Sequence, residues 1–341
     1  MVRAEGVEAL ARVLTCTAQG NTTLTRLDLS GNHCQDKGAE HIAEMLLGNQ
    51  TLRAMKLADN DIRAQGGEWM GAALQDNSAL EELDLSRNSQ LWGDGRCLGG
   101  GLARNARLAS LGLAAVGIYR HKAEPLAELL EANRRLERLD LSMNNIGASS
   151  SHRLAAALEV NDALTALDLT FNSLGDEGAG ALARAITKNR ALTSLSLRDN
   201  RIGEVGALQL QTALEVFSSI RSLDLRQNRI PAKLVEGIDA LVASAGVRAF
   251  ALEGPSAGVG QARNAAQPGP AKGAGLPAPL GASWPRTPVG PPGAAKKQSP
   301  SGLLPEVARQ PRPGGYPQDG ARAAPRGPSA RAAWTASPGP A

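Results

Sequence analysis

Apolar residues recur along most of the chain in one fixed pattern, LxxLxLxxN, in which polar and small residues fill the other positions. The pattern returns every 28 residues and has eight copies. The copies begin at Leu24, Leu52, Leu80, Leu108, Leu136, Leu164, Leu192 and Ile220. A strict period over so many copies is typical of solenoids, in which each unit buries its apolar face against its neighbours. The pattern therefore predicts a stack of similar structural units.

The Leu-x-Leu segment of each copy alternates apolar and polar residues, which predicts a strand with one buried face. In the sixth copy Leu167 and Leu169 are expected to face inward, and Asp168 outward. An asparagine follows the strand in seven copies, and its buried amide can satisfy backbone groups of neighbouring turns. This asparagine ladder consists of Asn32, Asn60, Asn88, Asn144, Asn172, Asn200 and Asn228. Val116 takes the ladder position in the fourth copy.

The second half of each copy carries apolar residues at helical spacing, for example Ala179, Leu182 and Ile186. A second asparagine column follows these helices, and we expect it to cap them because asparagine tolerates the left-handed conformation. This column consists of Asn21, Asn49, Asn77, Asn105, Asn133, Asn161 and Asn189. A strand, a helix and a parallel strand in succession wind into a right-handed coil.

The predicted fold class is α/β, a right-handed leucine-rich repeat solenoid shaped as a horseshoe. Strands lie closer together than helices do, so the parallel strands are expected on the concave face and the helices on the convex face. Residues 1–254 form this domain, with a capping helix around Val7–Thr17, the eight repeats and a truncated strand at Val247–Leu252. The first helix belongs to a repeat without a strand, so it is either a cap or part of a longer chain. Several glycines near Val116 predict a looser stretch over residues 89–119.

The LxxLxLxxN pattern, its period and its Ala/Leu-rich helices resemble the leucine-rich repeats of the ribonuclease-inhibitor type. Similar repeats occur in the leucine-rich domains of NOD-like receptors and in stand-alone intracellular proteins. The resemblance implies a non-catalytic scaffold that binds a protein partner on the concave face. It leaves open a regulator of a small GTPase, because the Ran GTPase-activating proteins use this repeat. Those proteins typically carry an acidic tail, whereas the tail here is basic.

Candidate partner-binding residues lie on the outward positions of the strands and in the turns that follow. Asp140 and Asp168 are adjacent like charges in an acidic stripe, and Met143 and Phe171 form an apolar anchor of the kind that often carries binding energy. Arginines in the last two repeats suit carboxylate or phosphate recognition. The candidates are Arg26, Asp28, Lys56, Glu82, Asp84, Arg138, Asp140, Met143, Asp168, Phe171, Arg198 and Arg226. The alternative is an ordinary solvated face of mixed charge.

Composition changes sharply at Pro255, because 18 of the 20 prolines lie at or beyond it. Residues 255–341 contain ten basic and two acidic residues, against 27 basic and 31 acidic residues in 1–254. A tail so poor in large aliphatic side chains is expected to be disordered. Arg322–Pro328 matches the RxxPxxP pattern of SH3 ligands, which proline-rich sequence also produces by chance. The tail also contains few aromatic residues, which argues against nucleic-acid binding by this segment.

No catalytic, metal or cofactor motif emerges, so we expect neither an enzyme nor a bound cofactor. Cys34 stands where other repeats have isoleucine and is expected in the core. The odd number of cysteines, without CxxC spacing, favours a reducing compartment and hence a cytoplasmic protein. Nothing near the N-terminus resembles a signal peptide, and no apolar run is long enough to span a membrane. We also expect the protein to be a monomer.

Overall fold

The computed structural model describes residues 2–15, 21, 23–119, 122–216 and 219–244. The truncated strand, the tail boundary, the whole of residues 255–341 and the Arg322–Pro328 motif lie outside these ranges. The described residues include all eight predicted strands. They also include the N-terminal helix, which ends earlier than the sequence predicts, at Leu14.

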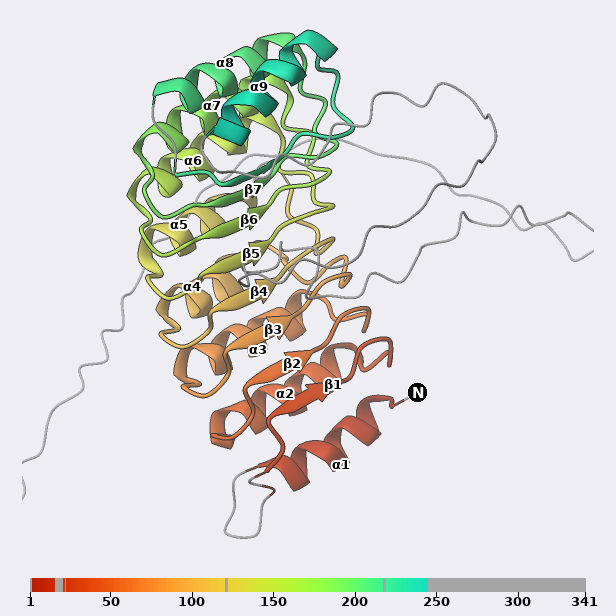
Figure 1. The fold of residues 1–341 in the computed structure, drawn as a ribbon. Helices are drawn as coiled ribbons and strands as arrows, with labels where there is room; N and C mark the ends of the chain where they lie inside the picture. The colour runs from red at the N-terminus through yellow and green to blue at the C-terminus, as the bar shows by residue number, and fades with distance from the viewer. Residues whose placement is uncertain (1, 16–20, 22, 120–121, 217–218, 245–341) are drawn as a thin grey trace, which may run out of the picture. The chain divides into compact units, whose positions relative to one another are not determined.

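The strands form one open parallel sheet in the order of the sequence. They are β1 (Arg26–Asp28), β2 (Ala54–Lys56), β3 (Glu82–Asp84), β4 (Ser110–Gly112), β5 (Arg138–Asp140), β6 (Ala166–Asp168), β7 (Ser194–Ser196) and β8 (Ser222–Asp224). Their register follows the sequence period, so that Leu139 pairs with Leu167 and Asp140 with Asp168. Figure 1 shows the strands side by side as one layer.

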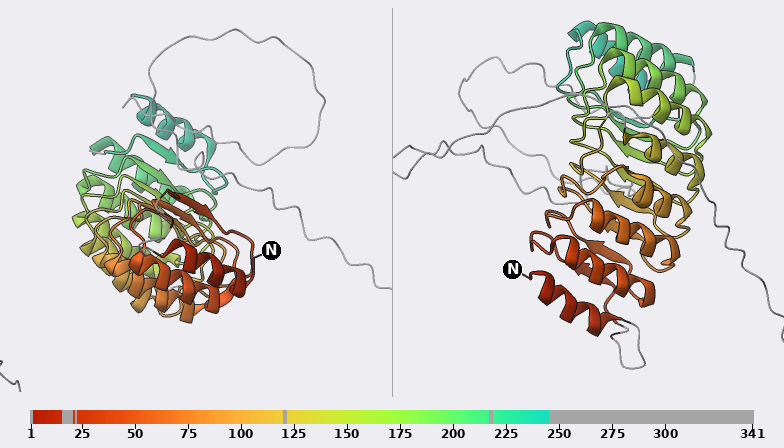
Figure 2. Two further views of the ribbon diagram at one scale, coloured as in Figure 1. Left: turned by 90° about the horizontal axis from the view of Figure 1, so that it is seen from below. Right: turned by 180° about the vertical axis from the view of Figure 1, so that it is seen from behind.

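The helices form the second layer. They are α1 (Ala4–Leu14), α2 (Gln35–Gly48), α3 (Ala64–Asp76), α4 (Arg96–Arg104), α5 (Glu124–Ala132), α6 (Gly147–Val160), α7 (Gly175–Lys188), α8 (Glu204–Val216) and α9 (Ala232–Ser244). Seen from behind, successive helices lie side by side along the stack (Figure 2). The predicted α/β solenoid of parallel strands alternating with helices is therefore confirmed.

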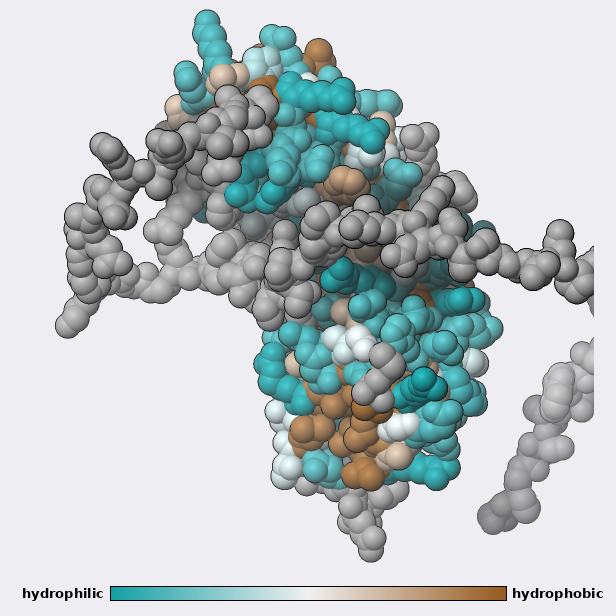
Figure 3. All heavy atoms as spheres, turned by 90° about the vertical axis from the view of Figure 1, so that its right-hand side faces the viewer, coloured by the Kyte–Doolittle hydropathy of each residue, from teal (hydrophilic) through white to brown (hydrophobic). Residues whose placement is uncertain are grey.

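One apolar core fills the space between the two layers. The inward leucines of the central strands, such as Leu139 and Leu167, have no exposed area, and neither does Leu182 of α7. Burying one such side chain contributes roughly 1.5–3 kcal/mol. The core is less closed at the N-terminal end, where Leu24 and Leu27 are only partly buried. Hydrophobic side chains gather on the surface at that lower end of the molecule (Figure 3).

The ladder asparagines join the turn of one repeat to the turns beside it. The Asn172 amide Nδ2 donates to the carbonyls of Leu141 at 2.9 Å and Leu169 at 3.1 Å. Its backbone N–H donates to Oδ1 of Asn200 at 3.0 Å, which continues the chain of bonds into the next repeat. Val116 cannot supply such amide bonds in the fourth copy, where its own N–H donates to Oδ1 of Asn144 at 3.2 Å.

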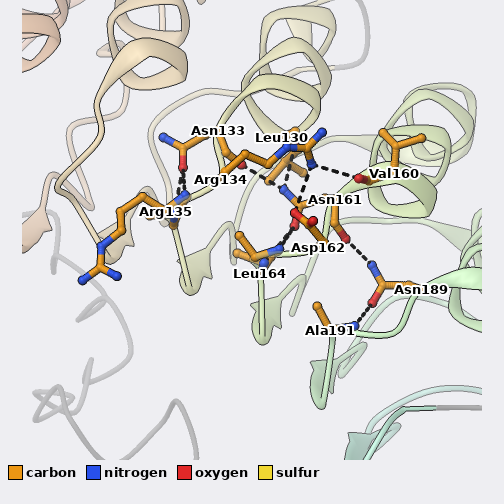
Figure 4. Close-up of polar contacts among 12 residues, drawn as sticks. Leu130, Asn133, Arg134, Arg135, Val160, Asn161, Asp162, Leu164, Asn189 and Ala191 are labelled. Carbon is orange, nitrogen blue, oxygen red and sulfur yellow. Dashed lines mark hydrogen bonds and ion pairs between the residues drawn. The ribbon is translucent and has the colours of Figure 1, made fainter.

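The second asparagine column caps helices α2 to α7, as the sequence predicts, but the left-handed conformation expected for it is wrong. Asn161, with φ −80° and ψ 123°, is extended, and the other described caps of α2 to α7 are similar. The side chain explains why (Figure 4). Oδ1 of Asn161 accepts from the N–H of Leu164 at 2.8 Å, and Nδ2 donates to the carbonyl of Leu130 at 2.7 Å. An extended backbone lets one amide bridge its own loop and the preceding helix end.

The glycine-rich segment around α4 forms a helix in which Gly99 and Gly101 lie close to neighbouring helices. A Cβ atom on Gly101 would lie 2.0 Å from the carbonyl oxygen of Gly71 in α3. In the preceding loop Trp92 is buried, and its Nε1 donates to the carbonyl of Lys122 at 2.7 Å. Glycine is therefore used here for the approach of two helices. The looser dynamics expected over residues 89–119 stays a prediction.

Candidate functional site

The candidate residues lie on the strand face, which we define as the outward positions of β1 to β8 together with the turn after each strand. Parallel register places these positions in columns across the sheet. Arg26, Glu82 and Arg138 share one column, and Asp28, Lys56, Asp84, Asp140 and Asp168 share the next. Met143, Phe171, Arg198 and Arg226 lie in the turns. The structure thus brings the predicted residues onto one side of the sheet.

The aspartates of the strand face also accept hydrogen bonds from the turns that follow them, which the sequence did not predict. The Asp140 carboxylate accepts a hydrogen bond from the N–H of Ser142 at 2.9 Å, and Asp168 accepts one from Thr170 at 2.8 Å. The carboxylates of Asp28, Asp84 and Asp224 accept the same kind of hydrogen bond, each from the backbone N–H of the residue two positions later. These bonds shape the turn after each strand. Asp168 is only 6% exposed, so the acidic stripe is less available to a partner than the sequence predicts.

Asp140 is the strand-face residue with the largest electrostatic perturbation. Burial and the nearby carboxylates of Asp168 and Asp84 raise its pKa to about 6, although hydrogen bonds from Ser142 oppose the shift. The ordinary aspartate pKa is 3.8, so between these two values the folded state binds more protons at this site than the unfolded state. Asp140 therefore makes the free energy of unfolding fall as the pH rises through this window.

We expect Asp140→Asn to remove this dependence, because asparagine keeps an acceptor for Ser142 without the charge. The measurement is chemical denaturation of both proteins at pH 3 and pH 7, which bracket the two pKa values of 3.8 and about 6. The variant should gain stability relative to the parent protein as the pH rises. A constant difference between the two proteins across the range would contradict the proposed ionisation.

The basic residues of the strand face have acidic or polar neighbours. Arg26 reaches across β2 to Glu82, with Nη2 and Oε2 3.2 Å apart. Arg226 forms two contacts with Asp224, at 2.9 and 2.6 Å, and Arg198 Nε donates to Gln227 at 2.8 Å. An exposed pair such as Arg26–Glu82 contributes little to stability. The ion pair of Arg226 with Asp224 reduces the positive charge that the last two repeats can offer to an anionic partner.

Met143 and Phe171 are the apolar side chains that stand out on this face, each 57% exposed. Both have a left-handed backbone, with φ 58° and 57°. The equivalent position is left-handed in every repeat, and its occupants are Gly31, Asp59, Arg87, Ala115, Met143, Phe171, Asp199 and Gln227. The N–H at this position donates to the next repeat, for example from Met143 to the carbonyl of Thr170 at 2.8 Å. Only Gly31 and, more weakly, Asp59 and Asp199 are of residue types that favour this conformation.

The histidine, cysteine and acidic side chains of the described ranges form no group of three or more that could hold a metal ion. Cys34 is fully buried, and burial raises its thiol pKa to about 11, as suits a core residue. No helix within the described part of the chain has both the length and the apolar character that crossing a membrane requires.

These features define a repeat protein in which outward side chains from all eight strands form one continuous surface, the strand face. A family model described as leucine-rich repeat matches residues 20–43, 48–68, 132–150, 161–183 and 188–210. The chain therefore contains leucine-rich repeats, and proteins of this family and fold are typically non-catalytic scaffolds for protein interactions.

Two solved structures illustrate the similarity. The leucine-rich repeat-containing protein LegL7 from Legionella pneumophila is 19% identical, with 71% of this chain and 77% of that chain covered and a TM-score of 0.43. Actin-binding site 2 of leiomodin-1 is 22% identical, with 37% of this chain and 73% of that chain covered and a TM-score of 0.34. A search of curated proteins finds no match.

Proposed function

We propose that this protein is a non-catalytic scaffold that binds a protein partner on the strand face, with Met143 and Phe171 as the apolar anchor. The observation that carries the proposal is that two large apolar side chains are exposed from left-handed backbone positions. A left-handed conformation is uncommon for bulky residues, and such strain costs of the order of 1 kcal/mol. The folded state alone gives no reason to place methionine and phenylalanine there.

The neighbours of this anchor support the same interpretation. Met143 and Phe171 lie in adjacent repeats, with Ala115 before them and Asp199 after them in the same column. Arg87 is exposed one repeat beyond Ala115. An apolar centre with charged residues at its margins is the usual composition of a protein interface. The partner would offer an apolar side chain with a carboxylate on the Arg87 side and a cationic group on the Asp199 side.

The double variant Met143→Asn, Phe171→Asn is expected to separate binding from stability. Asparagine accepts the left-handed conformation, so the free energy of unfolding should stay level or rise by roughly 1 kcal/mol. Affinity for the partner should fall by about 30-fold or more, as for the loss of about 2 kcal/mol at an interface hot spot. The partner is first captured on the full chain and identified by mass spectrometry, and its dissociation constant is then measured by calorimetry.

Leu47→Asn is the matched control, because Leu47 is 56% exposed at the end of α2 in the helix layer. It removes a similar apolar side chain away from the strand face and should leave the affinity unchanged. Unaltered binding of the double variant would refute the anchor. Equal losses in the double variant and the control would show that the strand face is not the specific contact.

Regulation of a small GTPase through the same face is the alternative. A nucleotide-hydrolysis assay on any GTPase recovered with the chain separates GTPase regulation from simple binding.

We also propose that the repeats are of the ribonuclease-inhibitor type, which the full helix in each 28-residue unit supports. A cytoplasmic location is proposed as well, and the free thiols of Cys34 and Cys97 support it.

A further inference from the structure

We propose that the outward side of α8 is a self-association surface, on which a second copy of this chain packs its own α8 in the antiparallel direction. The surface consists of Val205, Leu208, Thr212 and Val216, which we call the α8 ridge. Helix α8 lies between α7 and α9 in the helix layer, on the side of the solenoid away from the strand face (Figure 2). The partner-binding proposal therefore concerns a different surface.

Successive turns of α8 expose apolar groups to solvent. Val205 is 60% exposed, Leu208 47% and Val216 73%. Their spacing along the helix places them in one row, which Thr212 completes. The Thr212 hydroxyl donates to the carbonyl of Leu208 at 2.9 Å, so this polar group is already satisfied within the helix. The ridge is thus apolar along its whole length.

The 28-residue period shows that this ridge is not a general property of the helix layer. The same positions in α2, α3 and α7 are mostly charged or polar: Lys37, Glu40, Glu44 and Gly48; Gln65, Glu68, Ala72 and Asp76; Glu177, Gly180, Arg184 and Lys188. Helix α6 has one large apolar residue there, Val160. Single exposed apolar residues are ordinary, whereas a contiguous row of them marks an interaction surface.

An antiparallel second copy matches the ridge to itself. A two-fold axis between the two helix layers, perpendicular to α8 and midway between Val205 and Val216, places Val205 of each copy opposite Val216 of the other. Leu208 and Thr212 of both copies then meet near the axis. Apolar side chains of both copies leave water together, which favours the association. The contact is isologous, as is usual between identical chains.

The charges of the neighbouring helix agree with the same axis. Glu177 and Lys188 of α7 are the 28-residue equivalents of Val205 and Val216, so the axis also runs midway between them. It places Glu177 of each copy opposite Lys188 of the other. Their side chains are 68% and 63% exposed, and Lys188 also contacts Glu159 of its own chain at 2.7 Å. Opposite charges therefore meet beside the apolar contact, which favours this orientation.

The sequence favours a monomer, so sedimentation equilibrium of the full chain over a concentration series is the first measurement. We expect a reversible dimer. Leu208→Asp buries a carboxylate from each copy near the axis and should raise the dimer dissociation constant by about tenfold or more. Leu47→Asp serves as the control, because Leu47 is 56% exposed at the end of α2, and it should leave the constant unchanged. Circular dichroism checks that each variant is folded.

Cysteine cross-linking tests the antiparallel register. The background is Cys16→Ser, Cys97→Ser, in which the buried Cys34 is the remaining native thiol. Val205→Cys and Val216→Cys in one chain should form interchain disulfides on mild oxidation. Neither substitution alone should do so, because the axis separates the two copies of each position by about 16 Å along the helix, at about 1.5 Å per residue.

A parent protein that stays monomeric across the concentration series would overturn the proposal, as would a dimer that is insensitive to Leu208→Asp. Absence of the cross-link in the folded double cysteine variant would rule out the antiparallel register. So would a cross-link between two copies of either single cysteine variant.

Discussion

Replacing Gly101 by alanine is expected to reduce the free energy of unfolding by about 3 kcal/mol, in the upper part of the range for overpacked sites. The new Cβ would lie 2.0 Å from the Gly71 carbonyl oxygen and 2.6 Å from its carbon. Both are backbone atoms, so no side-chain rotation can relieve the overlap. Helices α3 and α4 would have to separate, and the leucines beneath them would lose contacts. Urea denaturation of the full chain measures the change.

Gly100→Ala is the control for this substitution. Gly100 precedes Gly101 in α4, and a Cβ atom there would meet nothing within 4 Å. Alanine is the better helix former by roughly 0.5–1 kcal/mol, so this variant should be slightly more stable than the parent. A loss of similar size at both positions would show that helix propensity or unfolded-state effects decide the outcome, and not the contact with Gly71.

Asn172→Ala is expected to cost about 3 kcal/mol, because several buried groups each lose a hydrogen bond together. Asn172 has no exposed area, and its Nδ2 donates to three carbonyls, those of Leu141, Leu169 and Thr170. Its Oδ1 also accepts from the N–H of Ile146 at 3.4 Å. Alanine offers none of these groups, and water has no access to replace them. Thermal and chemical denaturation both report the loss.

Asn32→Ala tests whether burial sets this cost. Asn32 holds the same ladder position in the first repeat, where it is only partly buried. Its Nδ2 donates to Leu29 and Ser30 within its own turn. The bond to Ser30 is exposed and the bond to Leu29 is only partly buried, so the expected loss is below about 1 kcal/mol. Losses of equal size at Asn32 and Asn172 would mean that the turn itself, and not the buried inter-repeat bonds, requires asparagine.

The two asparagine columns show which structural features a sequence pattern predicts and which it does not. Both columns are visible in the sequence, and the role of a bridging amide could be predicted for the first because its neighbours are buried leucines. For the second, residue type alone predicts a left-handed conformation. Asn161 is extended instead, because its amide gains bonds to Leu130 and Leu164 only from that geometry. Residue type gives a preference for a conformation, and contacts between repeats decide it.

The strand face also combines features that the sequence predicts with features that only the structure shows. Met143 and Phe171 could be predicted as exposed neighbours from their place in the period. Their left-handed backbone could not, since most residues of the column are not of the types that favour it. The aspartates were correctly placed in one column, but their bonds to the following turn were missed. Such a bond depends on where the backbone turns, and the apolar period does not specify this.

By itself the sequence determined the repeat length, the order of strands and helices and the residues that form the core. Local periodicity suffices for this, because burial of one face is repeated in every unit. Only the tertiary structure decided the turn conformations, the partners of most charged side chains and the contact of Gly101 with Gly71. Most of these depend on groups one or more repeats apart, and their distance and direction are fixed only when the repeats stack.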